Sequence, residues 1–153
     1  MGQKFTPHQA LIKAQKYCAY QERCHSEVRN KLYGWGLYQS AVEETIVSLI
    51  HGDFLNEERF AEAYAIGKFR IKKWGKNKIL AELNKRKISE YCKKKGLEQI
   101  DQRDYLLTLA DVLKRRERQE KETNPFRRKQ KLANYLNSRG FEANLVWELL
   151  NDH

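Results

Sequence analysis

Three short segments of the chain repeat one pattern of residues at nearly equal spacing. In each, two apolar residues and a turn residue fall at positions i, i+4 and i+8, and a further apolar residue follows at once. The three copies are Val28–Leu37, Ile79–Ile88 and Leu132–Phe141, whose starts are 51 and then 53 residues apart. Amphipathic helices also align by chance, but the shared step from turn to apolar residue favours a true repeat. A period near 50 residues predicts a short array of helical units.

Helix-start signals surround these segments and predict about three helices in each unit. Thr6-Pro7 and Asn124-Pro125 each pair a capping side chain with a proline at the first helical position, and Asn56 and Asp101 are further caps. In the first unit, we expect Ser26 to cap the second helix. The chain has only two Pro and eight Gly, so helix interiors are rarely interrupted.

The expected fold is all-α, with three tandem three-helix, helix-turn-helix-like repeats that form an elongated, curved array. We place the first repeat at residues 1–52, the second, basic repeat at residues 53–100 and the third at residues 101–153. We also expect a monomer, whose units contact mainly their neighbours.

The central copy departs from the other two at its turn and in its third helix. Lys87 stands where the other copies have Gly36 and Gly140. A left-handed residue other than glycine costs roughly 1 kcal/mol or more, so we expect this turn to be built differently. The third helix of this copy has few apolar residues and carries Lys93–Lys95, so it is expected to be a weak element.

Positive charge is concentrated in the middle of the chain. The net charge is +10, and Lys68–Gly96, called the basic segment below, holds twelve Lys and Arg residues against two acids. The rest of the chain is balanced. Clustered rather than total charge indicates a polyanionic partner, either nucleic acid or an acidic protein groove. A solvated helix face is the alternative interpretation.

Aromatic residues interrupt the basic segment, as is typical of proteins that combine phosphate contacts with base stacking. Phe69 continues the apolar face of Phe60 and Tyr64 and is expected in the core, whereas Trp74 either plugs a turn or offers an exposed stacking surface. The four lysines of Lys72–Lys78 are expected at surface positions around that turn. The candidate partner contacts are Lys68, Arg70, Lys72, Lys73, Trp74, Lys76, Lys78, Lys85, Arg86, Arg127, Arg128 and Lys129.

No residues for catalysis, metal binding or cofactor binding stand out. The chain shows no pairing of nucleophile and base and no glycine-rich phosphate loop, so a protein that is not an enzyme and needs no cofactor is expected. Cys18, Cys24 and Cys92 lack C-x-x-C spacing, which favours reduced thiols over disulfides or a zinc site. No apolar run reaches the length of a membrane span and the N-terminus lacks a signal-peptide core, so we expect a cytoplasmic protein without a membrane or small-molecule partner.

The stretch Gly52–Ile88 carries a family pattern. It reads F-L-N-E-E-R-F-A at residues 54–61, then a basic run, then W-G-K-N-K-I-L-A-E-L at residues 74–83. This pattern resembles the RecX family of recombinase regulators, and the resemblance extends from about His8 to Leu150. Asn56 stands where the family has Asp, and both residues cap a helix equally well.

The resemblance implies a protein that binds the RecA recombinase, lies along the groove of its filament on DNA, and suppresses strand exchange and ATP hydrolysis. Single-stranded DNA is a candidate direct contact. One alternative is a free-standing DNA-binding protein that uses Val28–Ile46 or Leu132–Leu149 as a helix-turn-helix, although the charge is centred on neither. Another alternative is a protein-interaction module that acts without DNA.

Overall fold

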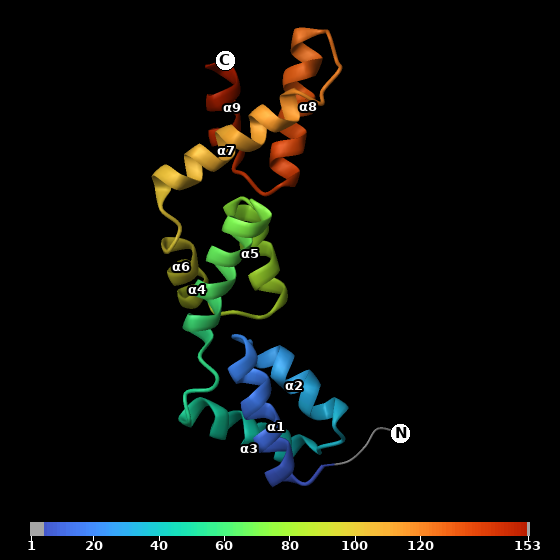
Figure 1. The fold of residues 1–153 in the computed structure, drawn as a ribbon, viewed down its shortest axis with the longest axis vertical. Helices are drawn as coiled ribbons and strands as arrows, with labels where there is room; N and C mark the ends of the chain where they lie inside the picture. The colour runs from blue at the N-terminus through green and yellow to red at the C-terminus, as the bar shows by residue number, and fades with distance from the viewer. Residues whose placement is uncertain (1–4, 153) are drawn as a thin grey trace.

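The computed structural model describes residues 5–152, which form an elongated stack of helices (Figure 1). The first four residues and His153, which the predicted repeat boundaries include, lie outside the described residues. The described residues form nine α-helices and one short π-helix. These are α1 Pro7–Tyr20, α2 His25–Gly34, α3 Gln39–His51, α4 Glu57–Gly67, η1 Lys68–Lys72, α5 Lys76–Lys85, α6 Glu90–Glu98, α7 Gln102–Glu117, α8 Pro125–Ser138 and α9 Ala143–Asn151.

The α-helices follow one another along the long axis in three groups of three. Helices α1–α3 lie at the bottom of Figure 1, α4–α6 in the middle and α7–α9 at the top. The predicted all-α fold of tandem three-helix repeats is therefore confirmed, and no strand occurs between residues 5 and 152. Repeats 1, 2 and 3 below denote these three groups of helices.

Most of the predicted caps are confirmed, and one is wrong. The side chains of Thr6, Asn56, Asp101 and Asn124 each accept a hydrogen bond from a backbone N–H in the first turn of the helix that follows. Helix α2, however, begins before Ser26. Its cap position is Cys24, whose N–H donates to the Glu27 carboxylate at 3.4 Å. A glutamate at the third helical position satisfies the cap N–H in this way, which places Ser26 inside the first turn.

The turns after α2, α5 and α8 share one hydrogen-bond pattern. The N–H of the apolar residue after the turn reaches back five residues, from Leu37 to Leu32 at 3.3 Å, Ile88 to Leu83 at 3.2 Å and Phe141 to Leu136 at 3.1 Å. Lys87 has φ 59°, as left-handed as Gly36 at 87° and Gly140 at 99°. The prediction of a different turn at Lys87 is wrong, because this capping pattern requires a left-handed residue and Lys87 adopts it.

Replacing Lys87 by glycine is expected to stabilise the protein by about 0.5–1 kcal/mol. The substitution removes the left-handed strain of a residue with a Cβ, and the greater freedom of glycine in the unfolded chain offsets only part of that gain. Urea unfolding measures the change. Lys94→Gly, an exposed position inside α6, is the control and should lose about 0.5–1 kcal/mol. A loss of stability in Lys87→Gly would contradict the interpretation.

Repeat 1 has its own core, whereas repeats 2 and 3 share one. Val28, Leu32 and Leu49 are fully buried in the first core, together with other residues of α1–α3. The second core joins apolar residues of α4, α5 and α6 to those of α7, α8 and α9, and among the described residues it includes only Cys24 from repeat 1. The joint between repeats 2 and 3 is therefore the more apolar of the two.

Charged groups hold the joint between repeats 1 and 2. Arg59 at the start of α4 lies 2.5 Å from the Glu22 carboxylate and 3.2 Å from that of Asp53. It also donates to the Asp53 carbonyl at 2.9 Å. Partly exposed ion pairs contribute little stability, and repeats 1 and 2 share almost no core, so this joint is expected to be weaker than the one between repeats 2 and 3.

Helix α6 packs closely in spite of its lysines. A Cβ on Gly96 would lie 2.7 Å from the Ala61 carbonyl oxygen, so α6 and α4 touch backbone to backbone. Lys93 is buried, and its ammonium donates to the Asn84 side chain and the Glu90 carboxylate. The expectation of a weak third helix is therefore wrong, because a small residue and a satisfied lysine replace the apolar side chains.

A turn of repeat 2 lies directly against a turn of repeat 3. Gly75 donates its N–H to the Arg139 carbonyl at 2.8 Å, and Asn77 donates to the Gly140 carbonyl at 2.9 Å. The Arg139 guanidinium in turn donates to the Lys72 carbonyl. A Cβ on Gly75 would lie 2.2 Å from the Gly140 carbonyl carbon. Glycine at position 75 is therefore what lets the two backbones meet.

Tyr105 of α7 completes this junction. Its hydroxyl accepts the N–H of Lys76 at 2.9 Å and donates to the Glu142 carboxylate. Its ring is fully buried, with centroids 5.8 Å from Phe69 and 5.5 Å from Phe141. Burial, and then the bond to Glu142, raises the pKa of Tyr105 above its usual range. The hydroxyl therefore remains protonated and keeps both hydrogen bonds. Phe69 is buried, as predicted.

Candidate nucleic-acid interface

Cations and aromatic rings alternate along one side of repeat 2. The guanidinium carbon of Arg86 lies 4.8 Å from the ring centre of Tyr64, and Lys68 Nζ lies 5.5 Å from that ring. Lys68 Nζ is also 5.1 Å from the ring of Trp74, and Lys78 Nζ is 4.7 Å from it. The row Arg86–Tyr64–Lys68–Trp74–Lys78, called the ladder below, is drawn from α4, η1, α5 and the turn before α5.

Helix periodicity explains part of the ladder. Tyr64 and Lys68 are four residues apart and therefore lie on one side. Lys78 lies in the first turn of α5, and Arg86 is the C-cap residue that follows this helix. Lys76 precedes Lys78 by two residues, about 200° around the helix, and it lies elsewhere. Its ammonium is 3.3 Å from the Gln102 side chain.

A tight reversal brings Trp74 beside Lys68. The wide π-helical turn η1 ends at Lys72, and the next residue, Lys73, is left-handed with φ 58°. Trp74 then donates its N–H back to the Lys68 carbonyl at 3.3 Å. Trp74 is half-buried and packs against the second core. It therefore fills the turn, while part of its ring stays exposed between two lysines.

Glu82 is the acid beside the ladder. Its carboxylate accepts hydrogen bonds from Lys85 and Arg86, both at 3.2 Å, and these bonds lower the pKa of Glu82, with Lys85 the larger cause. Burial raises the pKa of Tyr64, and Arg86 offsets part of this effect. Glu82 therefore partly neutralises Arg86. Neither Lys68 nor Lys78 forms an ion pair within residues 5–152, so their charge remains available.

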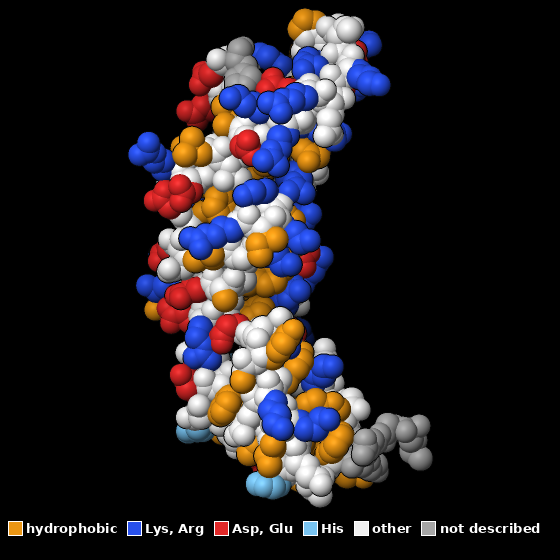
Figure 2. All heavy atoms as spheres, in the orientation of Figure 1, with side chains coloured by type: hydrophobic (Ala, Val, Ile, Leu, Met, Phe, Trp, Pro, Cys, Tyr) orange, Lys and Arg blue, Asp and Glu red, His pale blue; other side chains and the backbone are white. Residues whose placement is uncertain are grey.

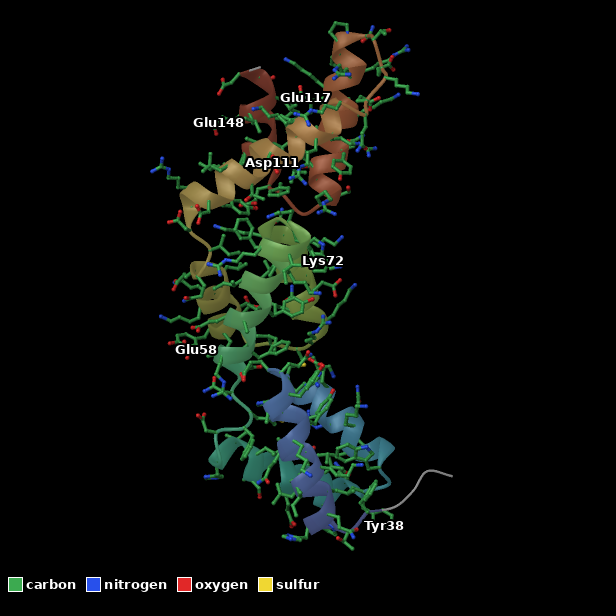
Figure 3. All side chains as sticks on the ribbon, in the orientation of Figure 1. Tyr38, Glu58, Lys72, Asp111, Glu117 and Glu148 are labelled. Atoms are coloured by element: carbon green, nitrogen blue, oxygen red, sulfur yellow. The ribbon has the colours of Figure 1, made fainter. Side chains whose placement is uncertain are left out.

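The remaining cations of the basic segment lie on other sides. Arg70 and Lys73 line a shallow hollow with Asp104 and Asp111 of α7, so acids of repeat 3 offset their charge. Lys72 is exposed, and Figure 3 labels it beside the helices of repeat 2 in the middle of the molecule. Figure 2 shows the wider distribution: Lys and Arg dominate the right edge of the middle of the molecule, and most visible Asp and Glu lie along the left edge.

The prediction of a surface turn at Lys72–Lys78 is wrong in one respect. Lys72 is exposed, but Lys73, Lys76 and Lys78 are half-buried, and the backbone of this turn docks on repeat 3. No local pattern in the sequence signals this contact, because it joins residues more than 60 positions apart. Reversing all four lysines would therefore alter the joint between repeats as well as the surface charge.

The second predicted basic group is partly structural. Arg128 donates from its two terminal nitrogens to the carbonyls of Glu120 and Glu117 at 2.8 and 3.0 Å, so it caps the end of α7. Arg127 is exposed and Lys129 is half-buried. Helix α8 begins near the top of Figure 1, away from the ladder.

A cleft lies at the Arg86 end of the ladder. It has a volume of about 340 Å³, and Tyr64, Lys68 and Arg86 of repeat 2 line it together with Glu22 and Glu27 of repeat 1. The ladder therefore reaches the joint with repeat 1. Sequence reasoning missed Tyr64, which it assigned wholly to the apolar face, although its i, i+4 spacing to Lys68 was a usable signal.

The ladder can bind a chain of phosphates and stack on exposed bases. Ammonium and guanidinium groups contact phosphates, and aromatic faces stack on any base.

Within residues 5–152, no group of three His, Cys, Asp or Glu side chains could hold a metal ion. The thiols of Cys18, Cys24 and Cys92 are buried and unpaired, and burial raises the pKa of each. None of the described helices is long and apolar enough to cross a membrane.

Comparison with protein families gives two matches in tandem. Residues 56–97 match the family model described as RecX, second three-helix domain, and residues 104–150 match RecX, third three-helix domain. The first match contains the ladder, and the second contains the Gly140 turn.

Curated relatives are similar over most of this chain. The regulatory protein RecX of Thermotoga petrophila is 30% identical over 142 residues, which cover 90% of this chain and 80% of that protein. The RecX of Clostridium perfringens is 29% identical over 121 residues, 78% of this chain and 56% of the relative. The RecX of Bacillus cytotoxicus is 23% identical over 137 residues, 90% of this chain and 51% of the relative. The chain thus spans little more than half the length of the last two relatives.

Two solved structures share the fold. The crystal structure of RecX from Lactobacillus salivarius superposes with a TM-score of 0.84 at 19% identity, covering 95% of both chains. A second crystal structure of regulatory protein RecX has a TM-score of 0.82 at 23% identity, covering 96% of this chain and 72% of the other. At these identities the likeness supports the arrangement of helices alone.

Proposed function

Because the chain belongs to the RecX family, we propose that it is a regulatory protein that binds the RecA recombinase and the filament that RecA forms on DNA. The observation that carries this proposal is the pair of family matches, over residues 56–97 and 104–150. The proposed effect is inhibition: the protein lowers ATP hydrolysis and strand exchange by RecA and adds no chemistry of its own.

The shape and charge of the molecule support binding along a filament. An elongated stack of repeats presents an extended surface rather than a single pocket. Repeat 2 carries the ladder and the excess positive charge, which suit a nucleoprotein rich in phosphates. The ladder residues Lys68, Trp74, Lys78 and Arg86 are the proposed central contacts. Arg70, Lys72, Lys73, Lys76, Lys85, Arg127, Arg128 and Lys129 are proposed as peripheral contacts, among which Arg128 is the least available.

We also propose that the structural units follow the boundaries expected from the sequence, at residues 1–52, 53–100 and 101–153. The matches to the second and third three-helix domains fall inside the second and third units. The separate core of repeat 1 supports a first boundary near Gly52. A binding surface built from such units can bend at the charged joint while repeats 2 and 3 move together.

Titration of the protein into a RecA reaction tests the proposed function. We expect substoichiometric amounts to lower the ATP hydrolysis by RecA that depends on single-stranded DNA, because one bound regulator affects many filament subunits. The measurement is the steady-state rate of ATP turnover, with filament length followed in parallel by electron microscopy. Unchanged turnover at equimolar protein would rule out the inhibitory role.

A further inference from the structure

Repeat 1 carries a second set of aromatic rings with cations over them. Lys31 Nζ lies 5.4 Å from the ring centre of Tyr17, on whose ring the Arg23 guanidinium also lies at 3.7 Å. Lys13 Nζ is 5.2 Å from the ring of Trp35. The charge count along the sequence gives little sign of this set, because residues 1–52 carry six lysines and arginines against four acids and so have a small excess of positive charge. The arrangement nevertheless has the same chemistry as the ladder.

A groove lies between the two rings. Its volume is about 470 Å³, and it is lined by Tyr17, Trp35, Lys31, Asn30, Glu27 and Gly34. This volume lies within the roughly 300–1,000 Å³ of small-molecule sites. Gly34 leaves part of the groove open, because a Cβ at this position would meet nothing within 4 Å. The groove therefore combines aromatic walls with a cation and two groups that can hydrogen-bond a base edge.

The groove is close to the end of the ladder. Glu27 lines both this groove and the cleft that holds Tyr64, Lys68 and Arg86. One side chain thus separates two hollows, and rings and cations continue from repeat 2 into repeat 1. A single strand of nucleic acid bound along the ladder would therefore reach the groove directly.

We propose that the groove between α1 and α2 holds an unpaired base of a single-stranded nucleic acid whose backbone lies on the ladder. Tyr17 and Trp35 supply the stacking surfaces, Asn30 contacts the edge of the base, and Lys31 contacts a phosphate. This inference rests on the proposed contact between the ladder and DNA. Bases in a duplex are stacked on one another and do not enter such a groove, so the ligand is single-stranded.

Blocking the groove at Gly34 tests the inference. The probe is fluorescein-labelled oligothymidine, and the control ligand is an abasic oligonucleotide of the same length, both measured by fluorescence anisotropy with the full chain. Gly34→Gln projects a neutral side chain into open space, and Gly34→Ala is the matched control. Both fit a helix end without a positive φ, and circular dichroism checks their folding. We expect Gly34→Gln to weaken binding of oligothymidine about fivefold or more, with the abasic ligand and Gly34→Ala within about twofold of wild type.

Each other outcome overturns a defined part of the inference. Equal weakening of both ligands in Gly34→Gln would show that the groove contacts the backbone and holds no base. Gly34→Gln could leave oligothymidine binding unchanged while Lys68→Glu/Lys78→Glu weakens it. That outcome would show that DNA contacts the ladder and not the groove. Failure of the wild-type protein to bind oligothymidine would overturn both contacts with DNA, and the RecA assay would still test the regulatory role independently.

Glu27, which lines both hollows, provides a second test, in which the affinity for DNA should rise. Glu27→Gln removes a negative charge between the two hollows, while its amide oxygen can still accept the Cys24 N–H that caps α2. We expect oligothymidine to bind a few fold more tightly, because the variant removes the repulsion between a carboxylate and a nearby phosphate. Weaker binding in a folded Glu27→Gln variant would contradict a strand that passes this residue.

Discussion

Replacing Gly75 by alanine is expected to cost about 3 kcal/mol or more and to separate repeat 3 from repeat 2. The new Cβ would lie 2.2 Å from the Gly140 carbonyl carbon and 2.3 Å from the Phe141 nitrogen, both of which are backbone atoms. Gly75 itself has φ −77°, which alanine adopts freely, so the cost is steric. Neither backbone can move away without opening the core that the two repeats share.

Urea unfolding measures this effect, with Gly67→Ala as the control. Gly67 is another glycine of repeat 2, at the end of α4, but a Cβ there would meet nothing within 4 Å. The control should be neutral or more stable by up to about 1 kcal/mol. Hydrogen exchange locates the damage: the amides of Gly75 and Asn77, which donate to repeat 3, should lose protection in Gly75→Ala. Wild-type stability in Gly75→Ala would show that the two turns are not in close contact.

Local signals in the sequence were sufficient to predict the fold. Caps such as Asn56 and Asp101, and the turn that follows each second helix, depend on residues within one or two helical turns of one another. Their repetition along the chain predicts the stack of units. Lys87 is an exception to the expectation that glycine is needed at this left-handed turn position. A lysine adopts the left-handed conformation there in spite of its steric cost.

The arrangement of the basic residues could not be predicted in the same way. The 3.6-residue periodicity of α4 does not continue past η1, because the wider π-helical turn and the left-handed Lys73 change the direction of the chain. The sides on which residues after Lys73 lie therefore cannot be extrapolated from α4. The position of Lys78 and Arg86 beside Lys68 and Tyr64 depends on that change of direction. The contact of Gly75 with Gly140 likewise joins distant parts of the chain, and nothing in the sequence around either glycine indicates the other as its partner.

Reversing two ladder charges, Lys68→Glu with Lys78→Glu, is expected to weaken binding of single-stranded DNA and of the filament roughly tenfold or more. Both ammonium groups flank Trp74 and lack an ion-pair partner among the described residues, so they are free to contact phosphates. Each lost phosphate contact lowers the slope of log affinity against log salt by about 0.7 for a single strand. The slope should therefore fall by about 1.4 in the double variant.

A variant with the same charge change elsewhere decides whether position matters. Lys94→Glu with Lys95→Glu alters the net charge equally, but neither lysine is a proposed contact: Lys94 lies in a hollow with Glu90 and Glu98, and Lys95 Nζ lies 3.9 Å from the Glu98 carboxylate. If the ladder is the contact, this control keeps most of the salt dependence, because only the long-range field changes. Salt titrations of both variants, with circular dichroism to confirm folding, make the comparison. Equal slopes for the two folded variants would show that the basic segment acts through its total charge, and the ladder would then be no more than a solvated face of repeat 2.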